Sequence, residues 1–119
     1  MAWRFEAANL LLWALGAENA DIRHADSLAD PDDVRRGAQA LRKGGLVPGA
    51  MRLRPAAEIL DALDLAWRQH WIVRQARQKG LVPDGIDPDV ISERHHALNW
   101  LTGFHNDPGT SWDDVETPT

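Results

Sequence analysis

Residues 55–80, PAAEILDALDLAWRQHWIVRQARQKG, form the longest stretch of the chain with the pattern of a helix. Proline is common at the first helical position, and glycine often follows the last turn. Between Pro55 and Gly80 there is no other proline or glycine, so the stretch predicts one helix of about seven turns. We expect this helix to be the long backbone of the packing, and the first helix of the chain to be central.

The same signals place three shorter helices around it. Asp30-Pro31 and Asp87-Pro88 each combine a favourable N-cap with a proline at the first helical position. They predict helices that run to about Lys43 and to near Gly103. Residues 3–16 are strong helix formers and are apolar almost all round, which is typical of a buried helix.

The remaining segments predict turns and helix ends. Residues 42–49 and 78–85 share the order glycine, apolar residue, proline, which is typical of a Schellman ending. Residues 45–53 allow at most a short extended piece, and residues 104–119 form a turn-rich tail. The 119 residues therefore predict a single all-α domain of four main helices. Because the chain has six tryptophans, we expect a Trp-rich core.

Composition excludes several classes of protein. The chain has no cysteine, which excludes disulfides, thiolate metal sites and cysteine nucleophiles. The longest apolar run, residues 10–15, is too short to cross a bilayer. The N-terminus lacks the pattern of a signal peptide, so we expect a cytoplasmic protein without membrane contact.

The charges are unevenly distributed along the chain. Residues 34–57 contain six basic residues and no acidic one: Arg35, Arg36, Arg42, Lys43, Arg52 and Arg54. From His95 onward there is no lysine or arginine, and the chain carries four acidic residues: Asp107, Asp113, Asp114 and Glu116. We expect the two segments to face each other or to be solvated. The net charge of −5 argues against nucleic-acid binding, although the basic segment keeps that alternative open.

Charged residues also occur where the helices should be apolar. On a helical wheel, His70, Arg74 and Arg77 fall inside the apolar arc of residues 55–80. Arg94 lies in the apolar arc of the fourth helix, and Glu6 lies in the first helix. A buried guanidinium without a partner is strongly destabilising, so these arginines must meet carboxylates or reach water.

Two interpretations of this group stay open. In the first, carboxylates pair with the arginines and the cluster is structural. In the second, it is a pocket for an anion or a planar group, because guanidinium forks match carboxylates and phosphates and indole faces stack. The candidate binding residues are His70, Arg74, Arg77, Arg94, Glu6, Glu93, Trp67 and Trp71.

The stretch SERHHALNWLTGFHND, residues 92–107, raises the question of a metal site. Zinc-binding helices use histidines four residues apart, whereas His95 is followed at that spacing by Asn99. We therefore expect no metal and no other cofactor. We expect a solvated polar face, with an interface through His96, Asn99 and Trp100 as the alternative.

Known catalytic patterns are also missing. Glu58 and Asp61 give one carboxylate pair of the kind that holds Mg²⁺ in all-helical nucleotide pyrophosphohydrolases. A second pair is absent, because Glu93 is followed three residues later by His96. We predict no catalytic residues.

Several scattered motifs occur together in one known family. They are Trp3-Arg4-x-Glu6-Ala7, Leu11-Leu12-Trp13-Ala14-Leu15-Gly16, Leu53-Arg54-Pro55, Glu58-Ile59-Leu60-Asp61, Arg68-x-His70-Trp71, Ala76-Arg77, Glu93-Arg94, Ala97-Leu98-Asn99-Trp100-Leu101 and Trp112-Asp113-Asp114-Val115. With them the chain resembles the bacterial domain of unknown function 4272 family over almost its whole length. The resemblance implies a mostly helical bacterial protein, and it implies neither an activity nor catalytic residues.

These observations favour a protein that binds another protein or itself. We expect dimerisation through the first or the fourth helix, because the first helix has more apolar surface than a short chain can cover. The alternatives are a small-molecule or anion-binding domain or enzyme that uses the Arg/His/Trp group, and a nucleic-acid-binding protein that uses the basic segment 35–54.

Overall fold

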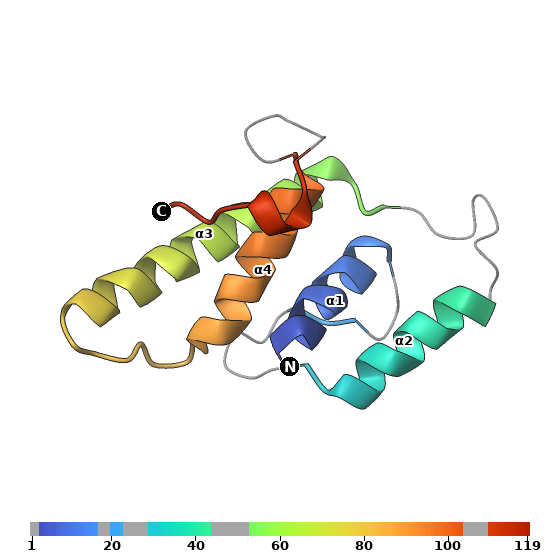
Figure 1. The fold of residues 1–119 in the computed structure, drawn as a ribbon, viewed down its shortest axis with the longest axis horizontal. Coiled ribbons are helices and arrows are strands. Elements are labelled where there is room, and N and C mark those ends of the chain that lie inside the picture. Colours follow the sequence, from blue (N-terminus) through green and yellow to red (C-terminus); the bar gives the residue numbers. More distant parts are fainter. Residues whose placement is uncertain (1–2, 17–19, 23–28, 44–52, 104–109) are drawn as a thin grey trace.

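The computed structural model describes residues 3–16, 20–22, 29–43, 53–103 and 110–119 of the chain. These residues form helices α1 (Trp3–Ala14), α2 (Pro31–Lys43), α3 (Ala56–Gln78) and α4 (Pro88–Leu101) and the 3-10 turn η2 (Trp112–Asp114). The described ranges contain no β-strand, so the predicted all-α fold is confirmed (Figure 1). The extended piece expected at 45–53 and the helix ending expected at 42–49 lie almost entirely outside the described residues.

The helix ends follow the predicted signals. Asp30 and Asp87 each accept a hydrogen bond from the backbone N–H two residues later, at 2.9 Å. At the end of α3, the Leu81 N–H donates to the Ala76 carbonyl and the Gly80 N–H donates to the Arg77 carbonyl. These two bonds, with Gly80 at a φ of 69°, make a Schellman motif.

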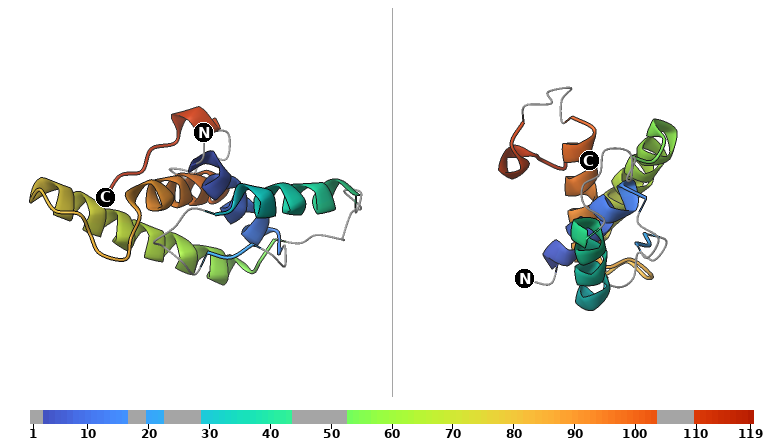
Figure 2. Two further views of the ribbon diagram at one scale, coloured as in Figure 1. Left: turned by 90° about the horizontal axis from the view of Figure 1, so that it is seen from below. Right: turned by 90° about the vertical axis from the view of Figure 1, so that its right-hand side faces the viewer.

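The helices pack in a row. From left to right in Figure 1 the order is α3, α4, α1 and α2, and the main helix contacts are those between neighbours in this row. Figure 2 shows the end of α3 and α2 at opposite ends of the molecule, along its longest dimension of 49 Å. The first helix, α1, lies inside the row together with α4, in agreement with its expected central place. The long helix α3 stands at one end of the row and packs chiefly against α4, so it is not the backbone of the whole packing.

The core consists mainly of small and aliphatic side chains. Its fully buried cluster is Ala7, Leu10, Ile59, Ala66, Ala97 and Leu98. Trp13 and Trp112 pack against this cluster, whereas Trp67, Trp71 and Trp100 are 41–45% exposed. The expected Trp-rich core is therefore only partly present. Alanines at the helix contacts let the backbones approach closely, and this leaves no room for indole rings between them.

The C-terminal end of α1 is held by one arginine. Arg54 donates from its backbone N–H to the Ala14 carbonyl at 2.7 Å and from Nε to the Trp13 carbonyl at 2.6 Å. Its guanidinium also lies 4.6 Å from the centre of the Trp13 ring. A cation placed at the last carbonyls of a helix is favourable because those carbonyls carry partial negative charge. The Leu53-Arg54-Pro55 motif therefore links α1 to the start of α3.

Candidate functional site

Two of the inward-facing charges form a buried ion pair. Arg94 Nε lies 2.8 Å from Glu6 Oε1, and the two side chains are 7% and 0% exposed. The second carboxylate oxygen of Glu6 accepts from the Ala29 N–H, and Arg94 Nη1 donates to the Ile22 carbonyl, each at 2.8 Å. Every described buried polar side-chain atom has a hydrogen-bond partner. The structural interpretation is therefore supported for this pair, which joins α1, α4 and two connecting segments.

Two histidines meet on the other side of α4. The Nδ1 atoms of His70 and His95 lie 2.8 Å apart in the α3–α4 interface, with the ring planes at 83°. Both residues are buried, although we expected His95 on a solvated face. The pKa of each ring is lowered to about 4, chiefly by burial, and for His70 the neighbouring Arg74 and Arg77 contribute to this lowering. For His95 the pKa is also lowered by His70, Arg74 and His96. Both rings are therefore neutral at pH 7, and one Nδ1 donates a proton to the other.

The C-terminal segment, residues 110–119, covers the polar side of α4. His96 Nε2 donates to the Trp112 carbonyl at 2.8 Å, and Asn99 Nδ2 donates to the Glu116 carbonyl at 2.9 Å. The Trp112 ring also contacts the rings of His96 and Trp100. This face was expected to be solvated or to bind a partner, and it is instead covered by the chain's own tail.

The same segment reaches α3. Arg74 donates to the hydroxyls of Thr119 and Thr117, at 2.6 and 3.3 Å. Within the segment, the side chain of Val115 is buried. The C-terminal segment thus lies across α4 onto α3, and Arg74 is engaged there and not in an anion site.

A groove of about 440 Å³ lies between α3, α4 and the C-terminal segment. It is lined by Leu60, Leu63, Asp64, Trp67, His95, Asn99 and Pro118. Of the candidate binding residues, only Trp67 lines this groove, with His70 behind His95. Leu60 was not among the candidate binding residues, although the helical wheel places it on the same arc as Trp67. No local signal in the sequence places Pro118 there.

The remaining candidates lie apart from one another. Arg77 and Trp71 are exposed on α3. Glu93 lines a second cleft, between α1, α4 and η2, with Leu11, His96, Trp112 and Asp113 among its neighbours. The eight candidate residues are thus distributed over the Glu6–Arg94 pair, the two-histidine interface, the two clefts, the contact of Arg74 with the C-terminal segment and the exposed surface of α3.

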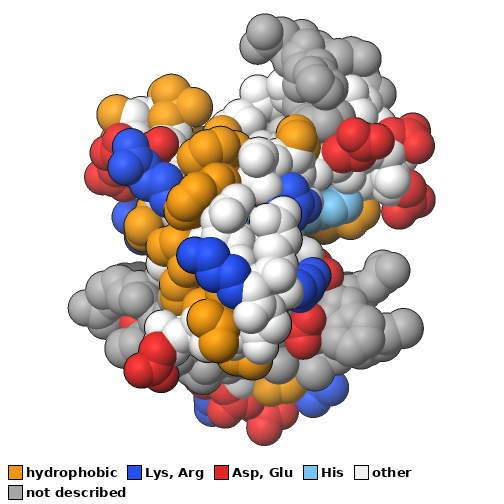
Figure 3. Space-filling view, turned by 90° about the vertical axis from the view of Figure 1, so that its left-hand side faces the viewer, with side chains coloured by type: hydrophobic (Ala, Val, Ile, Leu, Met, Phe, Trp, Pro, Cys, Tyr) orange, Lys and Arg blue, Asp and Glu red, His pale blue; other side chains and the backbone are white. Residues whose placement is uncertain are grey.

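The side of α3 that borders the groove exposes large apolar side chains. Leu60, Trp67 and Trp71 are 54%, 42% and 45% exposed. Their spacing of seven and four residues puts them within about 40° of one another on the helix. We call these three residues the α3 row. Figure 3 views the molecule from the side on which α3 lies and shows a band of hydrophobic side chains with Lys and Arg side chains beside it.

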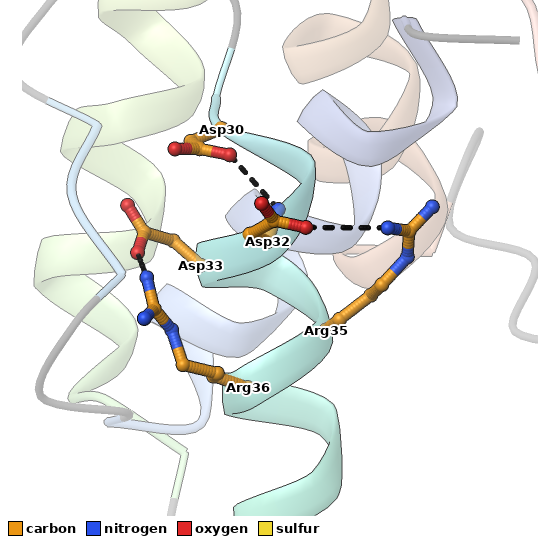
Figure 4. A network of polar contacts seen from close by, with 5 residues as sticks. All are labelled: Asp30, Asp32, Asp33, Arg35 and Arg36. Atoms are coloured by element: carbon orange, nitrogen blue, oxygen red, sulfur yellow. Dashed lines mark hydrogen bonds and ion pairs between the residues drawn. The ribbon is translucent and has the colours of Figure 1, made fainter.

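The described arginines of the basic segment are paired within the chain. Arg35 and Arg36 form ion pairs with Asp32 and Asp33 on the first turns of α2, where the Asp30 cap also lies (Figure 4). Arg54 Nη1 lies 3.3 Å from Glu58 Oε2. The side chains of Arg42, Lys43 and Arg52 are outside the described part. Carboxylates beside these guanidinium groups oppose phosphate binding.

The described ranges contain no group of three or more histidine or acidic side chains arranged to hold a metal ion. None of their helices is long and apolar enough to span a bilayer.

The family of the chain follows from its sequence over nearly its whole length. The family model described as Domain of unknown function (DUF4272) matches residues 1–115. The chain belongs to this family. The match includes α1 to α4 and η2, and therefore the Glu6–Arg94 pair and the two histidines. No curated protein and no solved structure matched the chain.

Proposed function

We propose that this member of the DUF4272 family acts by binding another protein chain through the exposed side of α3 that borders the groove. The observation that supports the proposal is the α3 row, Leu60, Trp67 and Trp71, which is exposed on a helix that packs chiefly against α4. We further propose a bacterial cytoplasm as the setting, as the family resemblance implies.

Physical chemistry favours a protein as the occupant of this surface. Exposed indole rings that lie next to one another are uncommon on a monomer, and tryptophan is among the residues that contribute most to protein interfaces. Trp67 and Trp71 are held on a regular helix, so binding would order few side chains. In α1, by contrast, Ala7, Leu10, Leu12 and Ala14 are buried, and Leu11 and Trp13 pack against the core. The α3 row therefore offers more exposed apolar surface than the described side chains of the first helix.

The proposal can be tested in living cells of the host organism. A photo-reactive amino acid is placed at Trp71 and, in a matched variant, at Val82, which is apolar, 83% exposed and outside α3. We expect irradiation to give a protein adduct of defined mass from position 71 and none from position 82. Absence of an adduct at position 71 in cells that express the protein at its native level would contradict the proposal.

A second candidate function is supported by one feature of the groove. His95 bonds His70 through Nδ1, and its ring, although 1% exposed, is among the side chains that line the groove. A neutral imidazole beside the Trp67 ring suits an uncharged planar molecule, and the Asp64 carboxylate disfavours an anion. The test is nuclear magnetic resonance with a panel of heteroaromatic fragments. Shifts of the His95 and Trp67 ring signals that are lost in His95→Phe would support it, and unchanged signals with every fragment would remove it.

A further inference from the structure

We propose that the chain bound by the α3 row is a second copy of this protein, with the two α3 helices packed side by side and antiparallel. This inference rests on the proposed function and identifies its partner. The carrying observation is the arrangement of charge and apolar side chains along α3, which is complementary to itself when one copy is reversed.

The charges on α3 are separated along its length. Its first half holds only acids, Glu58, Asp61 and Asp64, and its second half holds only bases, Arg68, Arg74 and Arg77. A parallel pair of such helices would place like charges together. An antiparallel pair places the acidic half of each helix beside the basic half of the other, which lowers the electrostatic energy and sets the orientation.

The positions on α3 also agree on one register. In a two-fold symmetric interface, if residue i contacts residue j of the partner, then residue j contacts residue i. Three points along α3 fall within two residues of one another. They are the midpoint between Leu60 and Trp71, the midpoint between Asp64 and Arg68, and Trp67 itself. At 1.5 Å per residue, that is within about 3 Å along the axis. One two-fold axis therefore pairs Leu60 with Trp71, Asp64 with Arg68, and Trp67 with its own copy.

The side chains lie where this axis requires them. When antiparallel helices are related by a two-fold axis that lies between them and perpendicular to both, each flank of a helix faces the same flank of its partner. Asp64 and Arg68 lie on the same flank of the α3 row, where they now form an exposed ion pair at 3.0 Å. Each guanidinium can then reach the carboxylate of the second copy without moving to another face of the helix.

The first experiment measures mass in solution by sedimentation equilibrium with the purified full chain. We expect a dimer at micromolar concentration. Trp71→Glu is expected to weaken dimerisation more than about thirtyfold, since a buried interface tryptophan contributes about 2 kcal/mol or more. Val82→Glu, the same kind of change outside α3, is expected to leave the dissociation constant unchanged. A wild-type chain that stays monomeric up to about 100 µM would overturn the inference.

A charge reversal then tests the pairing. Asp64→Arg and Arg68→Asp each put like charges across the interface, and each is expected to weaken dimerisation about tenfold. An equimolar mixture of the two variants restores opposite charges at both positions, so it should dimerise about as tightly as the wild type. Both side chains are more than 60% exposed in the monomer, so folding is expected to be unaffected. A mixture no tighter than the separate variants would overturn the pairing.

Cross-linking tests the antiparallel orientation, because the natural chain has no cysteine. Ala57 and Gln75 lie on the same flank as Asp64 and Arg68, about 27 Å apart along α3, and the proposed axis brings each level with the other's copy. With a short thiol cross-linker, Ala57→Cys and Gln75→Cys should each give no dimer alone and a heterodimer when mixed. Self-linking of either variant alone would overturn the antiparallel arrangement.

The cellular adduct distinguishes this inference from the proposed function. An adduct at position 71 that contains a second copy of the chain supports both. An adduct with a different protein, together with a monomeric purified chain, overturns the second copy and leaves the proposed function in place. No adduct and a monomeric chain would overturn both.

Discussion

The Nδ1 atoms of His70 and His95 share one proton 2.8 Å apart in the buried contact between α3 and α4. This contact exists only while at least one ring is neutral, because two protonated rings would point N–H groups at each other. The pair therefore links the packing of α3 on α4 to pH.

We expect the protein to lose stability as pH falls from about 6.5 to 4. Both pKa values drop from 6.5 in the unfolded chain to about 4 in the folded one, so the unfolded chain binds more protons in this window. The stabilisation is fully present above pH 6.5 and is lost as pH falls through 4. At about 1.4 kcal/mol per pKa unit, the loss is on the order of 3 kcal/mol for each of the two histidines.

Urea unfolding measured at several pH values checks this prediction. The matched control is the His70→Gln/His95→Gln double variant, whose amide groups do not titrate. It should show a shallower dependence on pH whatever its absolute stability. An equal dependence in wild type and double variant would show that other groups cause the acid loss.

Breaking the buried ion pair should destabilise the fold strongly. Glu6→Ala leaves Arg94 charged without its carboxylate in the core, and removing one partner of a buried pair costs about 3–5 kcal/mol. The double variant Glu6→Leu/Arg94→Met should recover part of that loss because no lone charge remains. Chemical denaturation gives both values. The exposed ion pair between Asp64 and Arg68 is the control. Asp64→Ala should lower the free energy of unfolding by less than about 1 kcal/mol.

Arg54→Ala should destabilise the end of α1. The change removes the Nε bond to the Trp13 carbonyl, the stacking on the Trp13 ring and a cation at the helix C-terminus, which together contribute about 1–2 kcal/mol. Relative to the wild type, Arg54→Ala should accelerate hydrogen exchange more in the last turn of α1 than in α4. Arg54→Lys keeps the charge, so its exchange rate in the last turn of α1 should lie between those of the wild type and Arg54→Ala. Equal protection in all three proteins would contradict the role of Arg54 in holding this turn.

Gly80→Ala should destabilise the end of α3 for a backbone reason alone. No atom lies within 4 Å of a Cβ added at Gly80, but the φ of 69° is unfavourable for an L-residue. We expect a loss of about 1 kcal/mol in thermal or urea unfolding, and a smaller loss for Gly80→Asn. An alanine variant as stable as the wild type would show that the Schellman turn rearranges at no cost.

Much of the local structure could be predicted from single residues. The Asp-Pro starts of α2 and α4 and the glycine ending of α3 are confirmed, because each depends on bonds among residues close together in the chain. The oddly placed Glu6 and Arg94 were also recognised as needing partners, because a lone buried charge is costly.

The sequence by itself determined the helices, their ends and the presence of buried charges. Only the tertiary structure decided that Arg94 pairs with Glu6, 88 residues away, and that Arg74 holds Thr119 and not a ligand. It also placed Trp67 and Trp71 on the surface, 42% and 45% exposed, although their wheel positions within the apolar arc predicted inward-facing rings. The physical reason is how far apart in the sequence the interacting residues lie. Backbone hydrogen bonds and caps are formed within a turn, whereas the burial of a side chain depends on which helices pack together and how closely their backbones approach.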